Sequence, residues 1–368
     1  MARKSGNAKL RVGVIGGRFG RNHILAFGRT GNVEVTAFCQ RTRPEELARE
    51  FHIPHVFSDY RQLLALEGLD AISLAVPTYL HHPITMEALS RGLHVLCEKP
   101  LALNKEEAGA MLARAEEAGL VHMTAFNFRF IPAIQRMKEL LEEGYVGRPL
   151  HADLVWFSEG RADPGRPLGW RNRKELAGVG VLGDTGVHLV DLARWLVGDF
   201  TRVCGHAATF TKERPLPDGS GIGGVAVEDS CLFVAELVGG VQASIHASGV
   251  ARGGTVQSIG IFGSDGMLRV EIDRKTLAWL VGELWGAQGS NSVRELLPIP
   301  ERLTQGLNLS DPSRAPGEFL FSHLTRRFAQ SIQTGEPAGP SFRDGLAAQK
   351  VIDAVTKSAE QGSWVTVA

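Results

Sequence analysis

Three polar side chains in the middle of the chain follow a helical spacing, and their chemical types suit proton transfer. Asp184, His188 and Asp191 are spaced i, i+4 and i+7, which would place them on one face of a helix. A histidine has an ordinary pKa of about 6.5, so a neutral imidazole can take a proton from a hydroxyl group. We expect His188 to act as a general base and Asp184 to orient it or to hold a substrate hydroxyl. For Asp191 a structural hydrogen bond is an equal alternative.

A lysine far upstream could complete this set. Lys99 stands between Glu98 and Pro100 at the end of an apolar run. An ammonium group beside the reacting oxygen would hydrogen-bond it and stabilise the negative charge that forms there. Lys99, Asp184 and His188 are therefore the predicted catalytic residues. The competing interpretation of a lone helical histidine is a satisfied core or surface residue.

Weaker candidates for substrate contact precede the predicted catalytic helix. Arg161, Trp170 and Arg171 lie in a loop-rich stretch. The planar fork of an arginine and the face of an aromatic ring suit a polyhydroxylated or anionic small molecule. An ordinary loop packed on a sheet would use the same residue types, so both interpretations stay open.

Glycines mark the turn between the first predicted strand and the first predicted helix. The run is Gly16-Gly17-Arg18-Phe19-Gly20, and all five residues are predicted to bind a dinucleotide. Without side chains at the glycines, a pyrophosphate can approach the backbone N–H groups at the helix start. The run is one residue shorter than GxGxxG. Either the turn itself is shorter, or Ile15 takes the place of the first glycine.

The end of the second predicted strand bears on the choice of dinucleotide. An acidic residue there usually binds the adenosine ribose of NAD, but this chain has Gln40, followed by Arg41 and Arg43. A guanidinium can pair with a 2′-phosphate in bidentate fashion, whereas a carboxylate would repel it. We therefore expect Gln40 and Arg41 to contact the cofactor and NADP to be favoured over NAD. Arginines that are merely solvated are the alternative.

Short apolar runs alternate with helical stretches over the first third of the chain. Such strands, apolar on both faces, predict an α/β domain with a parallel sheet that helices cover on both sides. We assign residues 1–125 to this dinucleotide-binding domain. The expected strands are 10–15, 33–39, 71–76, 94–97 and 121–126, and the expected helices are 22–30, 44–51, 60–66, 82–91 and 105–118.

The remainder, 126–368, has a different pattern. Alternating β segments joined by glycine-bearing turns predict an α+β domain with a mostly antiparallel sheet. We expect this domain to bind the substrate and to form oligomers. Its expected strands are 150–157, 202–211, 230–237, 241–248, 255–263 and 267–272, with a helix at 132–143 and loops at 164–167 and 215–224.

Composition limits the classes of partner. The 368 residues carry 40 basic and 40 acidic side chains, so no net charge favours nucleic acid or an anionic membrane as a partner. No stretch approaches the roughly 18 apolar residues that span a membrane, and no signal peptide is recognised. Four cysteines stand alone in the sequence, and three of them sit in apolar runs that indicate buried thiols in a reducing compartment, so we expect a cytoplasmic protein. His81 and His82 are adjacent without further ligands, and we expect no metal.

Several ordered motifs together resemble those of the Gfo/Idh/MocA family, the relatives of glucose–fructose oxidoreductase and inositol dehydrogenase. They are the run Asp70–His81, the tripeptide Glu98-Lys99-Pro100, the segment Asn127-Phe128-Arg129-Phe130 and the stretch from Trp170 to Asp191. The resemblance covers nearly the whole chain. It implies an amino-terminal domain with a Rossmann-type, doubly wound parallel sheet. It also implies a second domain built on a large open sheet whose free face pairs subunits, giving a homodimer or homotetramer.

The resemblance also implies a reaction and further contacts. It implies NAD(P)-dependent hydride transfer at a hydroxyl-bearing carbon of a sugar, inositol or related polyol. Pro77, His81 and Glu98 would line the cofactor path, and we assign Asn127 to the same cofactor-binding set. Two alternatives stay open. One is a glycoside hydrolase in which bound NAD is reduced and reoxidised within each turnover, and the other is a non-catalytic dinucleotide sensor.

Overall fold

A computed structural model describes residues 9–273, 277–289, 293–307 and 316–368. The chain forms two compact units. The first contains the chain up to Ala102, Glu106–Asn127 and the described part of Ser313–Leu346, and the second contains Leu103–Lys105, the described parts of Phe128–Pro312, and Ala347–Ala368. The expected boundary at residue 125 lies close to the place where the chain leaves the first unit. A single boundary does not, however, include the later segment that returns to that unit.

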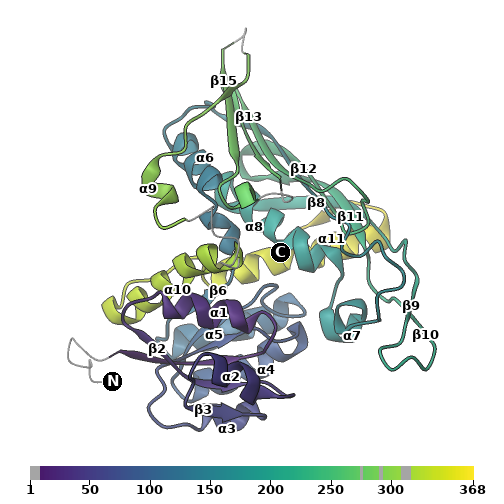
Figure 1. Cartoon of the computed structure of the whole chain (residues 1–368). Coiled ribbons are helices and arrows are strands. Elements are labelled where there is room, and N and C mark those ends of the chain that lie inside the picture. The colour runs from purple at the N-terminus through teal and green to yellow at the C-terminus, as the bar shows by residue number, and fades with distance from the viewer. Residues whose placement is uncertain (1–8, 274–276, 290–292, 308–315) are drawn as a thin grey trace. The chain divides into compact units, whose positions relative to one another are not determined.

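The first unit is built on a parallel sheet of six strands in the order β3-β2-β1-β4-β5-β6, with helices packed around it (Figure 1). The strand order reverses between β1 and β4, as in a doubly wound fold, which confirms the predicted α/β class. All four residues of β4 are buried, because helices cover a parallel sheet on both faces. The strands are β1 (Leu10–Ile15), β2 (Val33–Cys39), β3 (His55–Phe57), β4 (Ala71–Leu74), β5 (His94–Cys97) and β6 (His122–Thr124).

The helices of this unit include one from the far end of the chain. Helix α10 (Pro316–Thr334) packs against α1 (Gly20–Gly28), where the Thr325 and Thr30 hydroxyls lie 3.0 Å apart. Arg29, next to α1, forms an ion pair with Glu318 of α10. The other helices are α2 (Pro44–Glu50), α3 (Tyr60–Leu64), α4 (His81–Ser90) and α5 (Lys105–Glu117, which begins in the second unit).

The second unit is built on a sheet of nine strands in the order β16-β15-β14-β13-β7-β12-β11-β8-β17. Among the described strands every neighbouring pair is antiparallel except β7 with β12, which confirms the mostly antiparallel sheet. The strands are β7 (Pro149–Phe157), β8 (Phe200–Ala208), β11 (Ser230–Leu237), β12 (Val241–Ser248), β13 (Val256–Gly263), β14 (Gly266–Ile272), β15 (Glu283–Gln288), β16 (Glu295–Leu296) and β17 (Val365–Thr366). The expected loop at 215–224 contributes to a small hairpin of β9 (Glu213–Pro215) with β10 (Ile222–Gly224).

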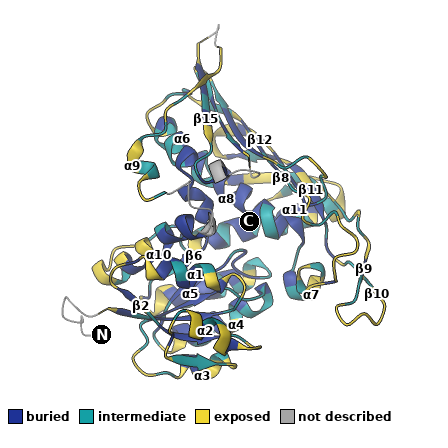
Figure 2. Cartoon of the chain, in the orientation of Figure 1, coloured by how far each residue is buried: buried dark blue, intermediate teal, exposed yellow. Residues whose placement is uncertain are grey.

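One face of this sheet carries the core of the second unit. Side chains alternate along β7, so that Ala152, Leu154 and Trp156 are buried. Helices α6 (Pro132–Glu142) and α8 (Val187–Leu196) pack on the sheet, and α8 is buried along most of its length (Figure 2). The remaining helices are α7 (Lys174–Ala177), α9 (Glu301–Thr304) and α11 (Phe342–Gln361, which begins in the first unit).

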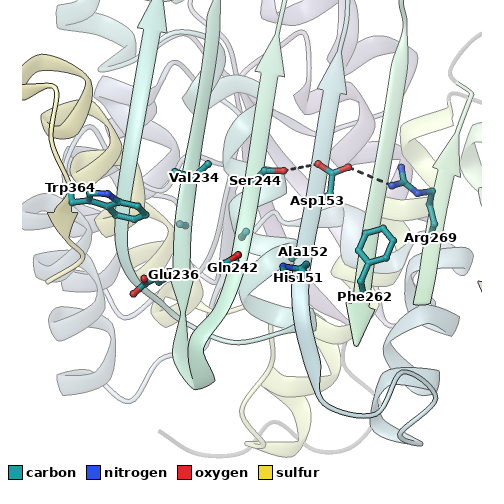
Figure 3. A pocket seen from close by; sticks show the side chains of 12 residues that line it. His151, Ala152, Asp153, Val234, Glu236, Gln242, Ser244, Phe262, Arg269 and Trp364 are labelled. Atoms are coloured by element: carbon teal, nitrogen blue, oxygen red, sulfur yellow. Dashed lines mark hydrogen bonds and ion pairs between the residues drawn. The ribbon is translucent and has the colours of Figure 1, made fainter. Parts of the chain in front are cut away.

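The opposite face of the sheet carries polar and apolar side chains around a hollow of about 570 Å³ (Figure 3). In the hollow, Asp153 accepts a hydrogen bond from the Ser244 hydroxyl at 2.7 Å and lies 3.6 Å from the Arg269 guanidinium. Val234, beside them, leaves 47% of its surface exposed. This face therefore combines apolar area with fixed charges.

The segment Lys174–Leu196 is long and apolar enough by composition to cross a membrane. This corrects the sequence-based statement that no stretch approaches that length, because an average over a window tolerates a few charged residues. Of its most apolar 18 residues, 72% are buried inside the protein. The segment includes α8, whose buried side chains form part of the core of the second unit.

The turn after β1 generates a stability prediction. Gly16 has a φ of +112°, and an added Cβ would overlap the Ala75 carbonyl oxygen. Gly16→Ala should therefore lower the free energy of unfolding by about 2–5 kcal/mol, from backbone strain plus overpacking. Gly109→Ala in α5, where the new methyl group meets open space, should raise it by roughly 0.5–1 kcal/mol. Urea denaturation of the two variants measures both, and equal stabilities would contradict the strain at Gly16.

Candidate functional site

The glycine turn of the first unit lies at the carboxyl ends of the parallel strands, where such sheets bind ligands. Ile15 stays in β1, paired with Cys39 and Leu74, and the left-handed residue is Gly16. Ile15 therefore does not take the place of the first fingerprint glycine, and the turn begins at Gly16. Gly20 starts α1 and packs against Val14, where an added Cβ would lie 3.3 Å from a Val14 methyl group.

The same turn lies against the end of β2. An added Cβ at Gly17 would overlap the side-chain oxygen of Gln40, so these two predicted residues are neighbours. The Gln40 amide donates to the Thr42 carbonyl oxygen at 2.5 Å, and Arg41 is exposed beside it. Arg18 and Phe19 are also exposed, at the amino end of α1. The helix N-terminus and the missing Cβ atoms fit a dinucleotide phosphate, because backbone N–H groups can reach it.

A buried polar network lies next to the predicted lysine. The Nδ1 atom of His23 lies 2.7 Å from the Ser73 hydroxyl, and its Nε2 atom lies 3.3 Å from the Glu98 carboxylate. Glu98 also accepts a hydrogen bond from the backbone N–H of Lys99 at 3.2 Å. The Lys99–Pro100 bond is cis. Sequence reasoning missed His23, which the structure shows to be fully buried; the available signal was a histidine three residues after the glycine turn.

His81 connects two loops of the first unit. Its ring nitrogens lie 2.9 Å from the Pro100 carbonyl oxygen and 3.0 Å from that of Val76. Burial lowers the pKa of His81, although these carbonyl groups oppose the shift. Pro77 follows Val76 and precedes a 3₁₀ turn at Thr78–Leu80. The ring therefore braces the segments that follow β4 and β5.

In the second unit the predicted catalytic helix has an irregular start. A π-helical turn, η4 (Leu182–Gly186), contains Asp184, and α8 begins at Val187. The expectation of a regular α-helix from Asp184 onward is therefore not met, because Asp184 lies in a π turn that continues directly into α8. A π turn has i→i+5 hydrogen bonds, so the i, i+4 spacing from Asp184 to His188 is not that of a regular α-helix. Such turns are frequent at functional sites.

The π-helical turn is held by a glutamate on a neighbouring loop. The Glu228 carboxylate accepts hydrogen bonds from the backbone N–H groups of Gly180 at 2.8 Å and Leu182 at 2.9 Å. A Cβ at Gly180 would overlap the Glu228 backbone. A larger residue at 180 would therefore displace the turn that carries Asp184.

Asp184 lies against two of the weaker substrate candidates. Its carboxylate is 3.3 Å from the Arg161 guanidinium and 3.6 Å from that of Arg171. Arg171 in turn stacks over the Trp170 ring at 4.3 Å. The structure thus brings Arg161, Trp170 and Arg171 to Asp184, which the sequence alone did not establish. The cluster offers both hydrogen-bond donors and acceptors, as recognition of sugar hydroxyls requires.

Arg161 is fixed by contacts along its whole length. Its backbone N–H donates to the Gly249 carbonyl oxygen at 2.8 Å, and a Cβ at Gly249 would lie only 2.7 Å from its side chain. Its own carbonyl oxygen accepts a hydrogen bond from the buried Arg214 guanidinium at 2.6 Å. Arg214 was not predicted, because its partners are backbone atoms of another loop.

His188 and Asp191 have separate partners in the same unit. Asp191, 1% exposed, receives two hydrogen bonds from the Arg129 guanidinium, at 2.8 and 2.5 Å. The structural interpretation of Asp191 therefore holds. The imidazole of His188 stacks on the Phe128 ring, with centroids 4.4 Å apart and planes within 15°. Among the described residues no group of three or more His, Cys, Asp or Glu side chains could hold a metal ion.

The predicted catalytic residues belong to different units. Lys99 and the cofactor candidates up to Asn127 are in the first unit, whereas Asp184 and His188 are in the second. Asn127 ends the second segment of the first unit, Glu106–Asn127, and begins the 3₁₀ turn η2 (Asn127–Phe130). The first unit thus carries the glycine turn that suits a dinucleotide. The second unit carries an imidazole, a carboxylate and two guanidinium groups.

Comparison with known proteins covers both units. The model of an oxidoreductase family with an NAD-binding Rossmann fold matches residues 10–126, and a GFO/IDH/MocA C-terminal domain matches residues 134–269. Levoglucosan dehydrogenase of Pseudarthrobacter phenanthrenivorans is 31% identical over 97% of this chain and 98% of its own length. D-Apiose dehydrogenase of Paraburkholderia graminis is 28% identical over 95% of this chain and 87% of its own. A solved complex of levoglucosan dehydrogenase with NADH and levoglucosan superposes with a TM-score of 0.88, at 31% identity over 98% of this chain and 99% of that chain.

Proposed function

Because the chain belongs to the Gfo/Idh/MocA family of oxidoreductases, we propose that it transfers a hydride between NADP and a hydroxyl-bearing carbon of a sugar or related polyol. The chain is an oxidoreductase with an NAD-binding Rossmann fold, and its relatives include dehydrogenases of levoglucosan and apiose. The observation that carries the proposal is the arrangement at the start of α8. There His188 follows a turn in which the Asp184 carboxylate lies against two arginines.

Each of the predicted residues has a separate role in the proposed reaction. The nicotinamide, when bound, supplies the hydride acceptor or donor. His188 takes the hydroxyl proton as the carbon is oxidised, and Lys99 stabilises the negative charge on that oxygen. Asp184 accepts a hydrogen bond from a substrate hydroxyl, while Arg161 and Arg171 hold the carboxylate and donate to further oxygens. A polyhydroxylated substrate satisfies such a mixed set of donors and acceptors better than an apolar one.

The preference for NADP rests on the end of β2. Gln40 replaces the usual acid, and Arg41 is exposed next to it, where a guanidinium can pair with a 2′-phosphate. The related levoglucosan dehydrogenase has been solved with NADH.

Replacing Arg41 tests the cofactor preference. Arg41→Ala should weaken NADP binding by about 1.5–3 kcal/mol, the size of a charge-assisted hydrogen bond, and leave NAD binding nearly unchanged. Arg43→Ala is the control, since Arg43 is exposed and faces Glu46 at 3.5 Å. Titration calorimetry with both dinucleotides measures the effect. Equal losses for NADP and NAD would mean that Arg41 has a structural role.

A substrate panel with catalytic variants tests the reaction. Levoglucosan, apiose, aldoses and inositols, each with NADP and with NAD, are followed by the absorbance of the reduced nicotinamide. On the best substrate, His188→Ala and Lys99→Ala should each lower kcat by roughly 10²–10⁴. The double variant should be only slightly slower, because residues that act as one unit are non-additive. His246→Ala is the control. His246 lies on the face of the sheet away from α8, so this variant should keep the kcat of the parent protein. Full activity of His188→Ala would remove the assignment of the base.

We also propose that the chain forms a homodimer or homotetramer through the free face of the nine-stranded sheet. Val234 leaves 47% of its surface exposed beside the hollow around Asp153 (Figure 3), and Leu232, two residues earlier on β11, also leaves 47% exposed. A charge among these side chains would have to be desolvated in an interface. Val234→Asp should therefore yield monomers in light scattering at micromolar concentration. Val238→Asp, in the turn after β11, should leave the oligomer intact. A monomeric parent protein would contradict the proposal.

A further inference from the structure

Three aromatic rings form a closed cluster at α8. The ring of Phe128 is nearly parallel to the imidazole of His188, with centroids 4.4 Å apart and planes within 15°. It is also nearly parallel to the indole of Trp156, at 4.9 Å and 19°. Trp156 and His188 complete the triangle at 5.8 Å. All three side chains are more than nine-tenths buried. One face of the imidazole is thus covered by a flat ring that itself rests on a strand residue.

The ring of Phe128 is fixed to the same helix by its neighbour. Arg129 follows Phe128 in the turn η2 and makes the bidentate ion pair with Asp191, which lies one helical turn after His188. The Arg129 guanidinium also lies over the Trp195 ring, 5.6 Å from its centroid. Two consecutive residues therefore attach the turn to two consecutive levels of α8. The backbone at Phe128 is therefore anchored to α8 by a buried ion pair, which is costly to open.

A flat contact of this kind addresses a specific weakness of histidine as a base. The χ2 torsion of histidine joins an sp³ and an sp² atom, so its energy wells are broad and do not fix the ring plane. A proton acceptor, however, must present one ring nitrogen within hydrogen-bond reach of the substrate hydroxyl. Stacking restricts rotation about χ2, and it uses the face of the ring. The nitrogens form hydrogen bonds in the ring plane, so the stack does not compete with proton transfer.

We propose that Phe128 is a positioning residue, which holds the imidazole plane of His188 for proton transfer. The inference rests on the proposed role of His188 as the base. It assigns a role in the reaction to the segment Asn127-Phe128-Arg129-Phe130 through a side chain that does not touch the reacting atoms. Trp156 supports Phe128 from the sheet, and Arg129 with Asp191 sets the distance between the turn and the helix.

The test compares two replacements of Phe128. Phe128→Leu keeps an apolar side chain but removes the flat ring, and we expect kcat on the best substrate of the panel to fall about 10- to 100-fold, as for a small misplacement of a catalytic group. The KM for the sugar and the Kd for NADPH should stay within about twofold, because neither ligand is held by the ring. Phe128→Tyr, which keeps the flat ring, should retain kcat within about threefold.

A second measurement keeps the test independent of the substrate. The ring protons of His188, identified by their loss in His188→Gln, should resonate upfield in the parent protein because they lie over the Phe128 ring, and they should move downfield in Phe128→Leu. Phe200→Leu is the matched control. It makes the same change at a phenylalanine of the same unit that is 5% exposed, against 6% for Phe128, and we expect a similar loss of unfolding temperature without a loss of kcat.

Three results would overturn the inference. One is an unchanged kcat in a folded Phe128→Leu protein whose His188 resonances have moved. Another is a set of resonances that do not move, and the third is an equal fall of kcat in Phe200→Leu. Each leaves His188 standing as the base. By contrast, full activity of His188→Gln would remove the proposed base itself, whatever Phe128 does.

Discussion

The buried ion pair between Arg129 and Asp191 is the constraint on which the position of α8, the helix that carries His188, depends. Two charges removed from water are tolerated only while they stay together, because separating such a pair costs about 3–5 kcal/mol. The pair joins the turn η2 to the middle of α8. In sequence, this turn directly follows a segment of the first unit. The rotation and depth of α8 are thereby set. The place of His188 on that helix then follows from the helix geometry rather than from contacts of its own alone.

A comparable constraint in the first unit depends on a glycine that has no Cβ atom. The strand β1 can be followed by a tight turn only because Gly16 adopts a left-handed conformation against the Ala75 carbonyl group. Behind the turn, the His23 ring packs against Phe321 of α10, with centroids 4.5 Å apart and planes tilted by 33°, and it contacts Glu98 next to the predicted lysine. A helix from the last sixth of the sequence thus completes the packing behind a turn near its beginning. This explains why the nucleotide-type unit is discontinuous along the chain.

The sequence predicted the architecture well and the site unevenly, for physical reasons. Alternation of apolar strands and helices is local, so the parallel sheet could be predicted, and so could the glycine turn. The apolar face of α10 shows that it must be buried, but not that it packs on α1. Counting i, i+4 and i+7 assumes an α-helix, and the π turn at Asp184 breaks that assumption. The partner of Asp191 lies 62 residues away in sequence, and no local spacing identifies such a pair.

The central position of β7 has a consequence for how the second unit forms. Both of its neighbours, β12 and β13, come much later in the chain, and the pairing with β12 is parallel, so no hairpin can bring them together. During synthesis β7 has two unpaired edges until those strands emerge, which makes it a site of aggregation for a nascent chain. Its outward residues His151 and Asp153 interrupt what would otherwise be a uniformly apolar β segment. A charge on an unpaired edge disfavours pairing with another chain, and Asp153 gives β7 such a charge before the sheet is complete.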